Sequence, residues 1–217
     1  MTLAEDLLAE GEPEREFDPG IAGRLPRKRV AGGALIRDRG GRVLFVVPGY
    51  KPFLDIPGGV ADANESPLAA CRREIREEIG LDLPVNRLLV VDWIPAHGVW
   101  PDGIMFIFDG GQLDKDQAAA LKPTDDELKG LRFLAYDDAV PLLRPSMARR
   151  VRAALDALDD DRPHYAEFGR CSSTTRRADV GGAGHGPAAA RTSTNGDGAS
   201  SALAPARRQK SAGRNAG

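Results

Sequence analysis

The segment that decides the fold runs from Gly59 to Leu81 and reads GVADANESPLAACRREIREEIGL. It predicts a sharply bounded helix, because Ser66 is a favourable N-cap and Pro67 suits the first helical position. Gly80 suits the C-terminal stop, since glycine adopts the left-handed conformation without strain. Asn64 also tolerates that conformation, so a tight loop is expected before the helix.

Three carboxylates share one face of this helix. At 100° per residue, Glu77 and Glu78 fall about 60° and 40° to either side of Glu74. Like charges at this spacing repel and destabilise an isolated helix, whereas oxygen ligands of this kind are what a hard divalent cation requires. The adjacent face carries apolar side chains that can pack on a sheet, namely Leu68, Cys71, Ile75 and Ile79.

The same segment resembles the Nudix box. The box pattern is a glycine, five residues, a glutamate, seven residues and then R-E-U-x-E-E-x-G-U, where U is a bulky aliphatic residue. Gly59, Glu65 and the run from Arg73 to Leu81 match every defined position. The resemblance extends less sharply over residues 28–158, and it implies the α/β class, as a Nudix-type α/β/α sandwich with a mixed sheet.

Apolar patterns around the box agree with alternating strands and helices. Strands are expected at residues 30–36, 42–47, 88–94, 104–108 and 131–136, and helices at 66–79, 114–121 and 146–158. The second strand is apolar on both faces, so it is expected to be covered on both sides. We divide the chain into a short helix and linker (1–27), the Nudix domain (28–160) and a low-complexity tail (161–217), which we expect to be disordered.

Composition narrows the function classes. The 217 residues carry 30 basic and 32 acidic side chains, so the net charge of −2 excludes a globally basic nucleic-acid binder. Two cysteines cannot form a disulfide framework, and no apolar run approaches the roughly 18 residues of a membrane span. The acidic N-terminus is unlike a secretion signal. We expect a cytoplasmic protein with no membrane partner and no specific nucleic-acid partner, either a monomer or a homodimer.

The tail after Gly169 has eight basic and two acidic residues and almost no large apolar ones. Weak, salt-sensitive contact with nucleic acid is the most its charge allows, and a solvated tail is the simpler interpretation. We therefore expect a chain ending near Phe168 to fold and function like the full chain.

The resemblance also assigns roles. Glu74, Glu77, Glu78 and the carbonyl of Gly59 match positions that bind Mg²⁺ or Mn²⁺ in Nudix hydrolases. Glu74 and Glu78 are candidates for the catalytic base. Arg73 is also a candidate catalytic residue, and it matches an arginine that holds the loop glutamate, here Glu65, in a structural pair.

Two further sets of residues are candidates outside the box. Glu127, with Asp125 and Asp126 beside it, is a candidate base in a region where some family members use an acidic residue; a charged loop is the alternative. Substrate-binding candidates are Tyr50, Lys51, Phe53 and Trp93, since aromatic rings stack on bases and lysine meets phosphate. For Phe53 and Trp93, a position in the core is the stronger interpretation.

The leading hypothesis is a metal-dependent hydrolase that cleaves the pyrophosphate linkage of a nucleoside diphosphate joined to another moiety. The main alternative is a non-catalytic nucleotide-sensing module on the same fold, and an isomerase on this fold is another. The complete set of box glutamates favours the hydrolase, because a sensor does not need a repulsive carboxylate cluster.

Overall fold

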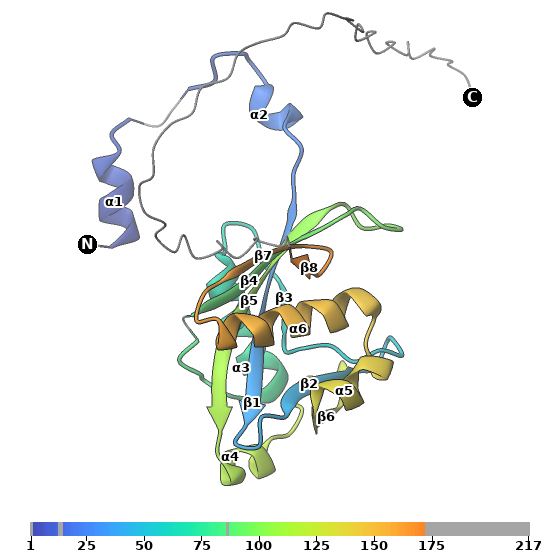
Figure 1. Cartoon of the computed structure of the whole chain (residues 1–217). Coiled ribbons are helices and arrows are strands. Elements are labelled where there is room, and N and C mark those ends of the chain that lie inside the picture. The colour runs from blue at the N-terminus through green and yellow to red at the C-terminus, as the bar shows by residue number, and fades with distance from the viewer. Residues whose placement is uncertain (1, 13–14, 86, 172–217) are drawn as a thin grey trace, which may run out of the picture. The chain divides into compact units, whose positions relative to one another are not determined.

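The computed structural model describes residues 2–12, 15–85 and 87–171 (Figure 1). The greater part of the expected tail, residues 172–217, lies outside the described residues. The N-terminal segment contains α1 (Leu3–Ala9) and α2 (Ile21–Arg24). Thr2 and Glu5 close a capping box on α1, and α2 lies in the stretch expected to be a linker.

The strands form one mixed sheet. They are β1 (Arg29–Asp38), β2 (Val43–Pro48), β3 (Gly58–Val60), β4 (Leu88–Ile94), β5 (Gly103–Leu113), β6 (Leu128–Leu134), β7 (His164–Glu167) and β8 (Arg170–Cys171). The order is β6-β2-β1-β5-β4-β7-β8, and β3 pairs with β1 off this path. The β1–β5 and β4–β7 pairs are parallel and the other pairs are antiparallel. The prediction of a mixed sheet is confirmed.

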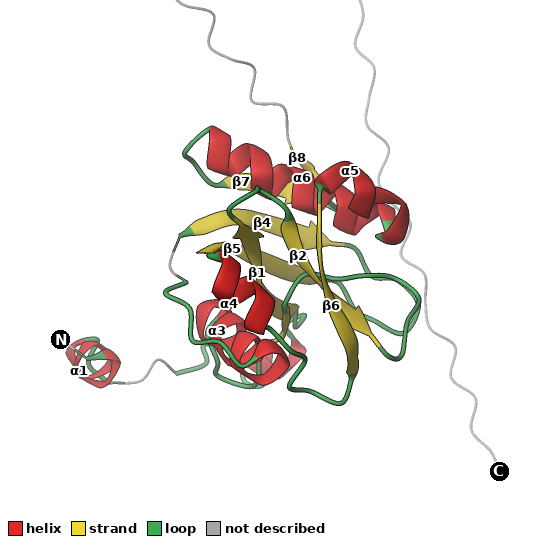
Figure 2. Cartoon of the chain, turned by 90° about the horizontal axis from the view of Figure 1, so that it is seen from below, coloured by secondary structure: helices red, strands yellow, loops and turns green. Residues whose placement is uncertain are grey.

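Helices cover both faces of this sheet (Figure 2). They are α3 (Pro67–Ile79), α4 (Lys115–Ala120), α5 (Tyr136–Ala139) with the 3₁₀ turn Val140–Leu142, and α6 (Pro145–Asp159). One core lies on the α3 side and includes Ile36, Leu44 and Ile75. The other lies on the α6 side and includes Leu35 and Phe45. Alternate residues of β1 and β2 thus enter opposite cores, which confirms the α/β/α sandwich and the expectation that the second strand is covered on both faces.

The sheet continues past the boundary that we expected at residue 160. Strands β7 and β8 extend it beyond β4, although their residues fall in the segment assigned to the tail. The buried carboxylate of Asp92 on β4 explains this extension. It accepts a hydrogen bond from the Gly169 N–H at 2.8 Å and ion-pairs with Arg150 of α6 at 2.6 Å. Composition of the tail could not reveal this contact, because the partner lies 77 residues away.

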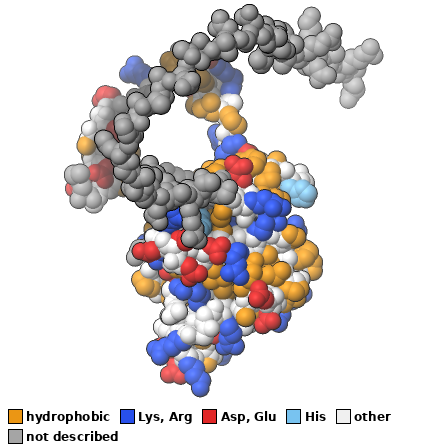
Figure 3. All heavy atoms as spheres, viewed as in Figure 1, with side chains coloured by type: hydrophobic (Ala, Val, Ile, Leu, Met, Phe, Trp, Pro, Cys, Tyr) orange, Lys and Arg blue, Asp and Glu red, His pale blue; other side chains and the backbone are white. Residues whose placement is uncertain are grey.

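The surface of the folded domain has mixed charge. On the face seen in Figure 3, basic, acidic and apolar side chains are intermingled over the described residues. Within the described part of the chain, no helix is long and apolar enough to cross a bilayer.

The Asp92 network predicts where the chain can be shortened. A chain ending at Phe168 loses the Gly169 N–H, and an under-satisfied buried carboxylate costs about 1–3 kcal/mol. A chain ending at Cys171 keeps this bond and the β7–β8 pair. The structure therefore revises the expectation that a chain ending near Phe168 behaves like the full chain, and we expect the shorter chain to melt several degrees below the longer one in a thermal denaturation experiment. Equal melting temperatures would contradict a structural role for this turn.

Candidate active site

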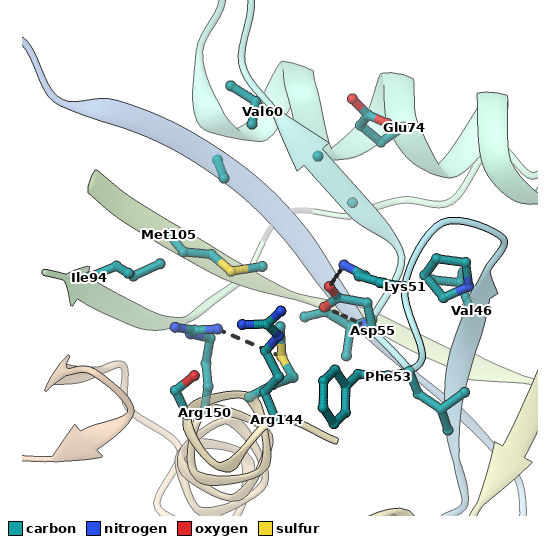
Figure 4. A pocket seen from close by; sticks show the side chains of 18 of the residues that line it. Val46, Lys51, Phe53, Asp55, Val60, Glu74, Ile94, Met105, Arg144 and Arg150 are labelled. Carbon is teal, nitrogen blue, oxygen red and sulfur yellow. Dashed lines mark hydrogen bonds and ion pairs between the residues drawn. The ribbon is translucent and has the colours of Figure 1, made fainter. Parts of the chain in front are cut away.

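A pocket of about 740 Å³ lies between the α3 and β3 region and helix α6 (Figure 4). Its acidic end contains Gly58, Gly59, Glu74 and Glu78, and Figure 4 shows Glu74 coming from α3. The opposite side is formed by α6, which contributes Arg150. The pocket therefore lies between the carboxylate helix and α6, over residues of the central strands β1 and β5.

Two glycines allow α3 to approach the sheet closely. A Cβ on Gly32 of β1 would lie 2.0 Å from the carbonyl oxygen of Pro67, at the first turn of α3. A Cβ on Gly59 of β3 would lie 2.2 Å from Oε1 of Glu74. Both distances are far inside van der Waals contact, so any side chain at either position would push the helix or its carboxylate away.

The local signals around α3 behave as the sequence predicts. The Ser66 Oγ accepts a hydrogen bond from the Ala69 N–H, and Gly80 ends the helix in the left-handed conformation at φ 69°. Asn64 is also left-handed, at φ 63°. The helix is therefore fixed at both ends by short-range interactions.

Arg73 ties this helix to the preceding loop. Its Nε and Nη2 donate to the two carboxylate oxygens of Glu65, each at 3.0 Å, and Nη2 also donates to the Val60 carbonyl. Its Nη1 donates to Glu74 at 2.8 Å and to Glu77 at 2.9 Å. The Glu65 carboxylate, followed by these other carboxylates, raises the pKa of Arg73. One guanidinium thus fixes the loop, strand β3 and two box glutamates.

Glu78 is the most perturbed carboxylate of the box. Burial raises its pKa, the hydrogen bond from the Gly58 N–H opposes that effect, and the charges of Glu74, Asp55 and Asp125 raise it further, to about 8. The Gly58 bond is 2.9 Å long. Burial also raises the pKa of Glu74, although Arg73 partly offsets it. In the metal-free protein, these surroundings therefore favour the protonated, uncharged form of the two carboxyl groups.

The structure brings together only some of the predicted box residues. Gly59, Glu74 and Glu78 line the pocket. Among the described lining residues, Arg73 and Glu77 are missing, since Glu77 turns toward Arg73 and its side chain is 53% exposed. Within the described chain, no three His, Cys, Asp or Glu side chains converge closely enough to hold an ion by themselves.

The loop before β6 places two acidic side chains at the pocket. Glu127 lines it, as does Asp125, whereas Asp126 is not among the described lining residues. Glu127 is exposed and Asp125 is half-buried. Asp125 also acts on Glu78, because its charge contributes to the raised pKa of that group. The structure thus makes Asp125 a candidate alongside Glu127.

Three of the four predicted substrate-binding residues line the pocket: Tyr50, Lys51 and Phe53. Lys51 ion-pairs with Asp55 at 2.6 Å. Burial lowers its pKa, but the Asp55 carboxylate raises it more strongly. Lys51 therefore stays charged.

Trp93 differs from both interpretations offered for it. It is 36% exposed and is not among the described residues that line the pocket, so it is neither a core residue nor a pocket residue. Its side chain and that of Asp92 point to opposite faces because strand residues alternate. Trp100 lines the pocket instead, with the Arg29 guanidinium 4.9 Å from its ring centroid.

The NUDIX domain model matches residues 27–156, well over half of the chain. The chain belongs to the Nudix family. No curated protein sequence matches it.

Solved structures share the Nudix fold. The MutT protein from Methanosarcina mazei Go1 has a TM-score of 0.51 and 19% identity, covering 63% of this chain and 98% of that one. The NUDIX domain of Shewanella oneidensis NrtR, solved in complex with ADP ribose, has a TM-score of 0.52 and 16% identity, covering 73% and 99%. At these identities the likeness establishes the fold.

Sequence reasoning missed several residues of this Nudix pocket, including Asp55, Arg144, Arg150 and Met105. The sequence nevertheless contained two signals of the buried ion pair at one end of this pocket. Arg150 interrupts the apolar face of the helix that also carries Met147 and Val151, and Asp92 interrupts the apolar run of Leu88–Ile94. A charge at a core position of each element is typical of a buried pair, which is what the structure contains.

Replacing Arg73 tests its role as a brace. Arg73→Ala should lower the free energy of unfolding by about 2 kcal/mol or more, because it removes bonds to partly buried carboxylates and leaves them to repel one another. Arg76→Ala is the matched control, since Arg76 is half-exposed and its only described ion pair, with Asp82, is 3.7 Å long. Denaturant unfolding gives both values. Equal stability of the two variants would show that Arg73 is not a brace.

The raised pKa of Glu78 predicts a pH dependence of the metal-free protein. In the folded state the carboxyl keeps its proton to about pH 8, whereas in the unfolded state it releases it near pH 4.5. The folded state therefore binds more protons between these values, and the stability that this group contributes falls as pH rises through that range. The Gln side chain of Glu78→Gln does not titrate, so the variant should not lose this stability. The melting temperature of the variant relative to the wild type should therefore be higher at pH 8 than at pH 5. Thermal melts in EDTA at both pH values test this; a constant difference would contradict it.

Proposed function

We propose that this Nudix protein is a divalent-metal-dependent hydrolase that cleaves the pyrophosphate linkage of a nucleoside diphosphate joined to another moiety. The observation that carries the proposal is the pair of partly buried carboxylates, Glu74 and Glu78, set against Gly58 and Gly59 at one end of the pocket. The ionised forms of both carboxylates are unfavourable in this setting unless a cation lies beside them. The substrate, Mg²⁺ dependence and site roles are parts of this proposal.

The donor set suits Mg²⁺ or Mn²⁺. Glu74, Glu78 and the backbone carbonyl of Gly59 would hold the ion, which is compatible with a magnesium site in which water and substrate phosphate fill the remaining positions. Glu77 would join only by giving up its bond to Arg73. The bound ion would neutralise the bridging phosphates and lower the pKa of a coordinated water.

The chain's own groups would position the reaction. Arg73 holds the loop and β3, and thereby fixes Gly59 relative to Glu74. Asp125 and Glu127 present carboxylates from the β6 side of the pocket, where one of them could accept the proton of the attacking water. Lys51, Arg144 and Arg29 supply cationic side chains for the rest of the substrate.

A turnover screen tests the hydrolase against the sensing alternative. Nucleoside triphosphates, ADP-ribose, dinucleoside polyphosphates and sugar nucleotides would each be incubated with the protein and Mg²⁺, and the products would be separated. Release of a nucleoside phosphate supports the hydrolase. Tight binding of one compound without any product would support the sensing module instead.

With the substrate from that screen, Glu78→Gln should slow turnover by about a hundredfold or more, because water activation and charge neutralisation both depend on this carboxylate. Glu167→Gln is the control, since that side chain is exposed on β7 and accepts a hydrogen bond from Tyr165. It should leave turnover unchanged. A loss of less than about tenfold for Glu78→Gln, or ~1.4 kcal/mol in transition-state stabilisation, would rule out an essential role.

A further inference from the structure

Arg150 is a buried cation at the end of the pocket remote from the carboxylates. Its side chain is 5% exposed, and it comes from α6. Figure 4 shows it beside Ile94 and Met105, well away from Glu74 on α3. Burial of a guanidinium is unfavourable unless its N–H donors have acceptors. The acceptor of each nitrogen therefore indicates which donors remain for a ligand.

One edge of the Arg150 guanidinium is fixed by Asp92. Nε and Nη2 both reach the Oδ2 atom of that fully buried carboxylate, at 2.7 and 2.6 Å. The other carboxylate oxygen of Asp92 is occupied by the Gly169 N–H. The planar guanidinium is therefore held in one orientation by groups that cannot easily move.

The other edge of the guanidinium has only a weak partner. Nη1 lies 3.8 Å from the sulfur of Met147, the single bond recorded for this nitrogen among the described residues. A thioether is a poor acceptor, whereas guanidinium nitrogens are strong donors and never accept. Arg150 thus presents unused donor capacity at a pocket wall that also contains the apolar side chains of Ile94, Met105 and Met147, with the Arg144 side chain nearby (Figure 4).

We propose that Arg150 binds the carbonyl edge of the substrate's nucleobase and selects guanine or uracil over adenine or cytosine. The inference rests on the proposed function, which places the phosphates at Glu74 and Glu78 and so directs the base toward the remote end. Guanine offers O6 and N7 as adjacent acceptors, which suit a guanidinium edge. Adenine and cytosine place an amino donor where guanine and uracil have an oxygen, and two donors facing each other in a buried site lose their hydrogen bonds.

Equilibrium binding to four analogues tests this preference without requiring turnover. The α,β-methylene diphosphates of guanosine, adenosine, uridine and cytidine contain a bridge that water cannot cleave at that position. Calorimetric titration with Mg²⁺ should show the guanine analogue binding about tenfold or more tightly than the adenine one, and the uracil analogue more tightly than the cytosine one.

Three variants separate base selection from structural support. Arg150→Lys keeps the charge that pairs with Asp92 but loses the planar edge, and it should bring each ratio within about threefold of unity. Arg150→Gln combined with Asp92→Asn avoids an unpaired buried carboxylate, because asparagine can still accept the Gly169 N–H. It should lose selectivity in the same way. Arg152→Lys is the control, since Arg152 lies on α6 over the Tyr136 ring and is half-exposed.

Each contrary outcome has a distinct meaning. Absence of base preference in the wild type, or retained ratios in folded variants, overturns the inference. Equal weakening of all four analogues would show that Arg150 binds phosphate, which also overturns it. Failure of the wild type to bind any analogue overturns it as well. If the preference is present but no compound in the turnover screen is cleaved, the hydrolase proposal fails and this inference stands.

Discussion

The architecture of the site depends on the guanidinium of Arg73. This one group bonds a loop carboxylate, a strand carbonyl and two helix carboxylates, so it connects three segments of the chain. Without it, the acidic face of α3 would face the Glu65 carboxylate of the loop with no cation between them. The Glu65 and Arg73 positions of the Nudix box thus have a structural role in this chain, because their ion pair holds the loop against α3.

The second constraint is space. The absence of a side chain at Gly32 and Gly59 lets α3 lie against the sheet, and this closeness partly buries Glu74 and Glu78. The apolar face of the same helix, with Cys71, supplies the hydrophobic free energy that balances this unfavourable burial. The core packing of α3 and the mutual repulsion of its carboxylates in the pocket are therefore two consequences of one helix position.

Local features of this fold were accessible to sequence reasoning, and long-range pairings were not. Ser66, Asn64 and Gly80 act within a few residues of themselves, so their roles are visible in the printed sequence. Trp93 could not be placed, because a strand's pattern does not tell which of its faces turns toward the pocket.

The partners of Asp92 were also beyond reach from sequence. Arg150 and Gly169 contact Asp92 only after the sheet and α6 have assembled. No local sequence pattern predicts a contact between residues so far apart in the chain. The same limitation hid β7 and β8, which are short and lie next to a segment of low complexity.

The parallel pairing of β4 with β7 also constrains the order of assembly during synthesis. Strand β4 becomes available some seventy residues before β7, since Val90 pairs with His164 and Asp92 with Ala166. Until the ribosome has released the segment around Gly169, the carboxylate of Asp92 lacks its amide partner and one edge of β4 is open. Unpaired strand edges are sites of association between nascent chains. Completion of this domain is therefore coupled to release of its last dozen folded residues, and a pause in translation just before them would leave an aggregation-prone edge exposed.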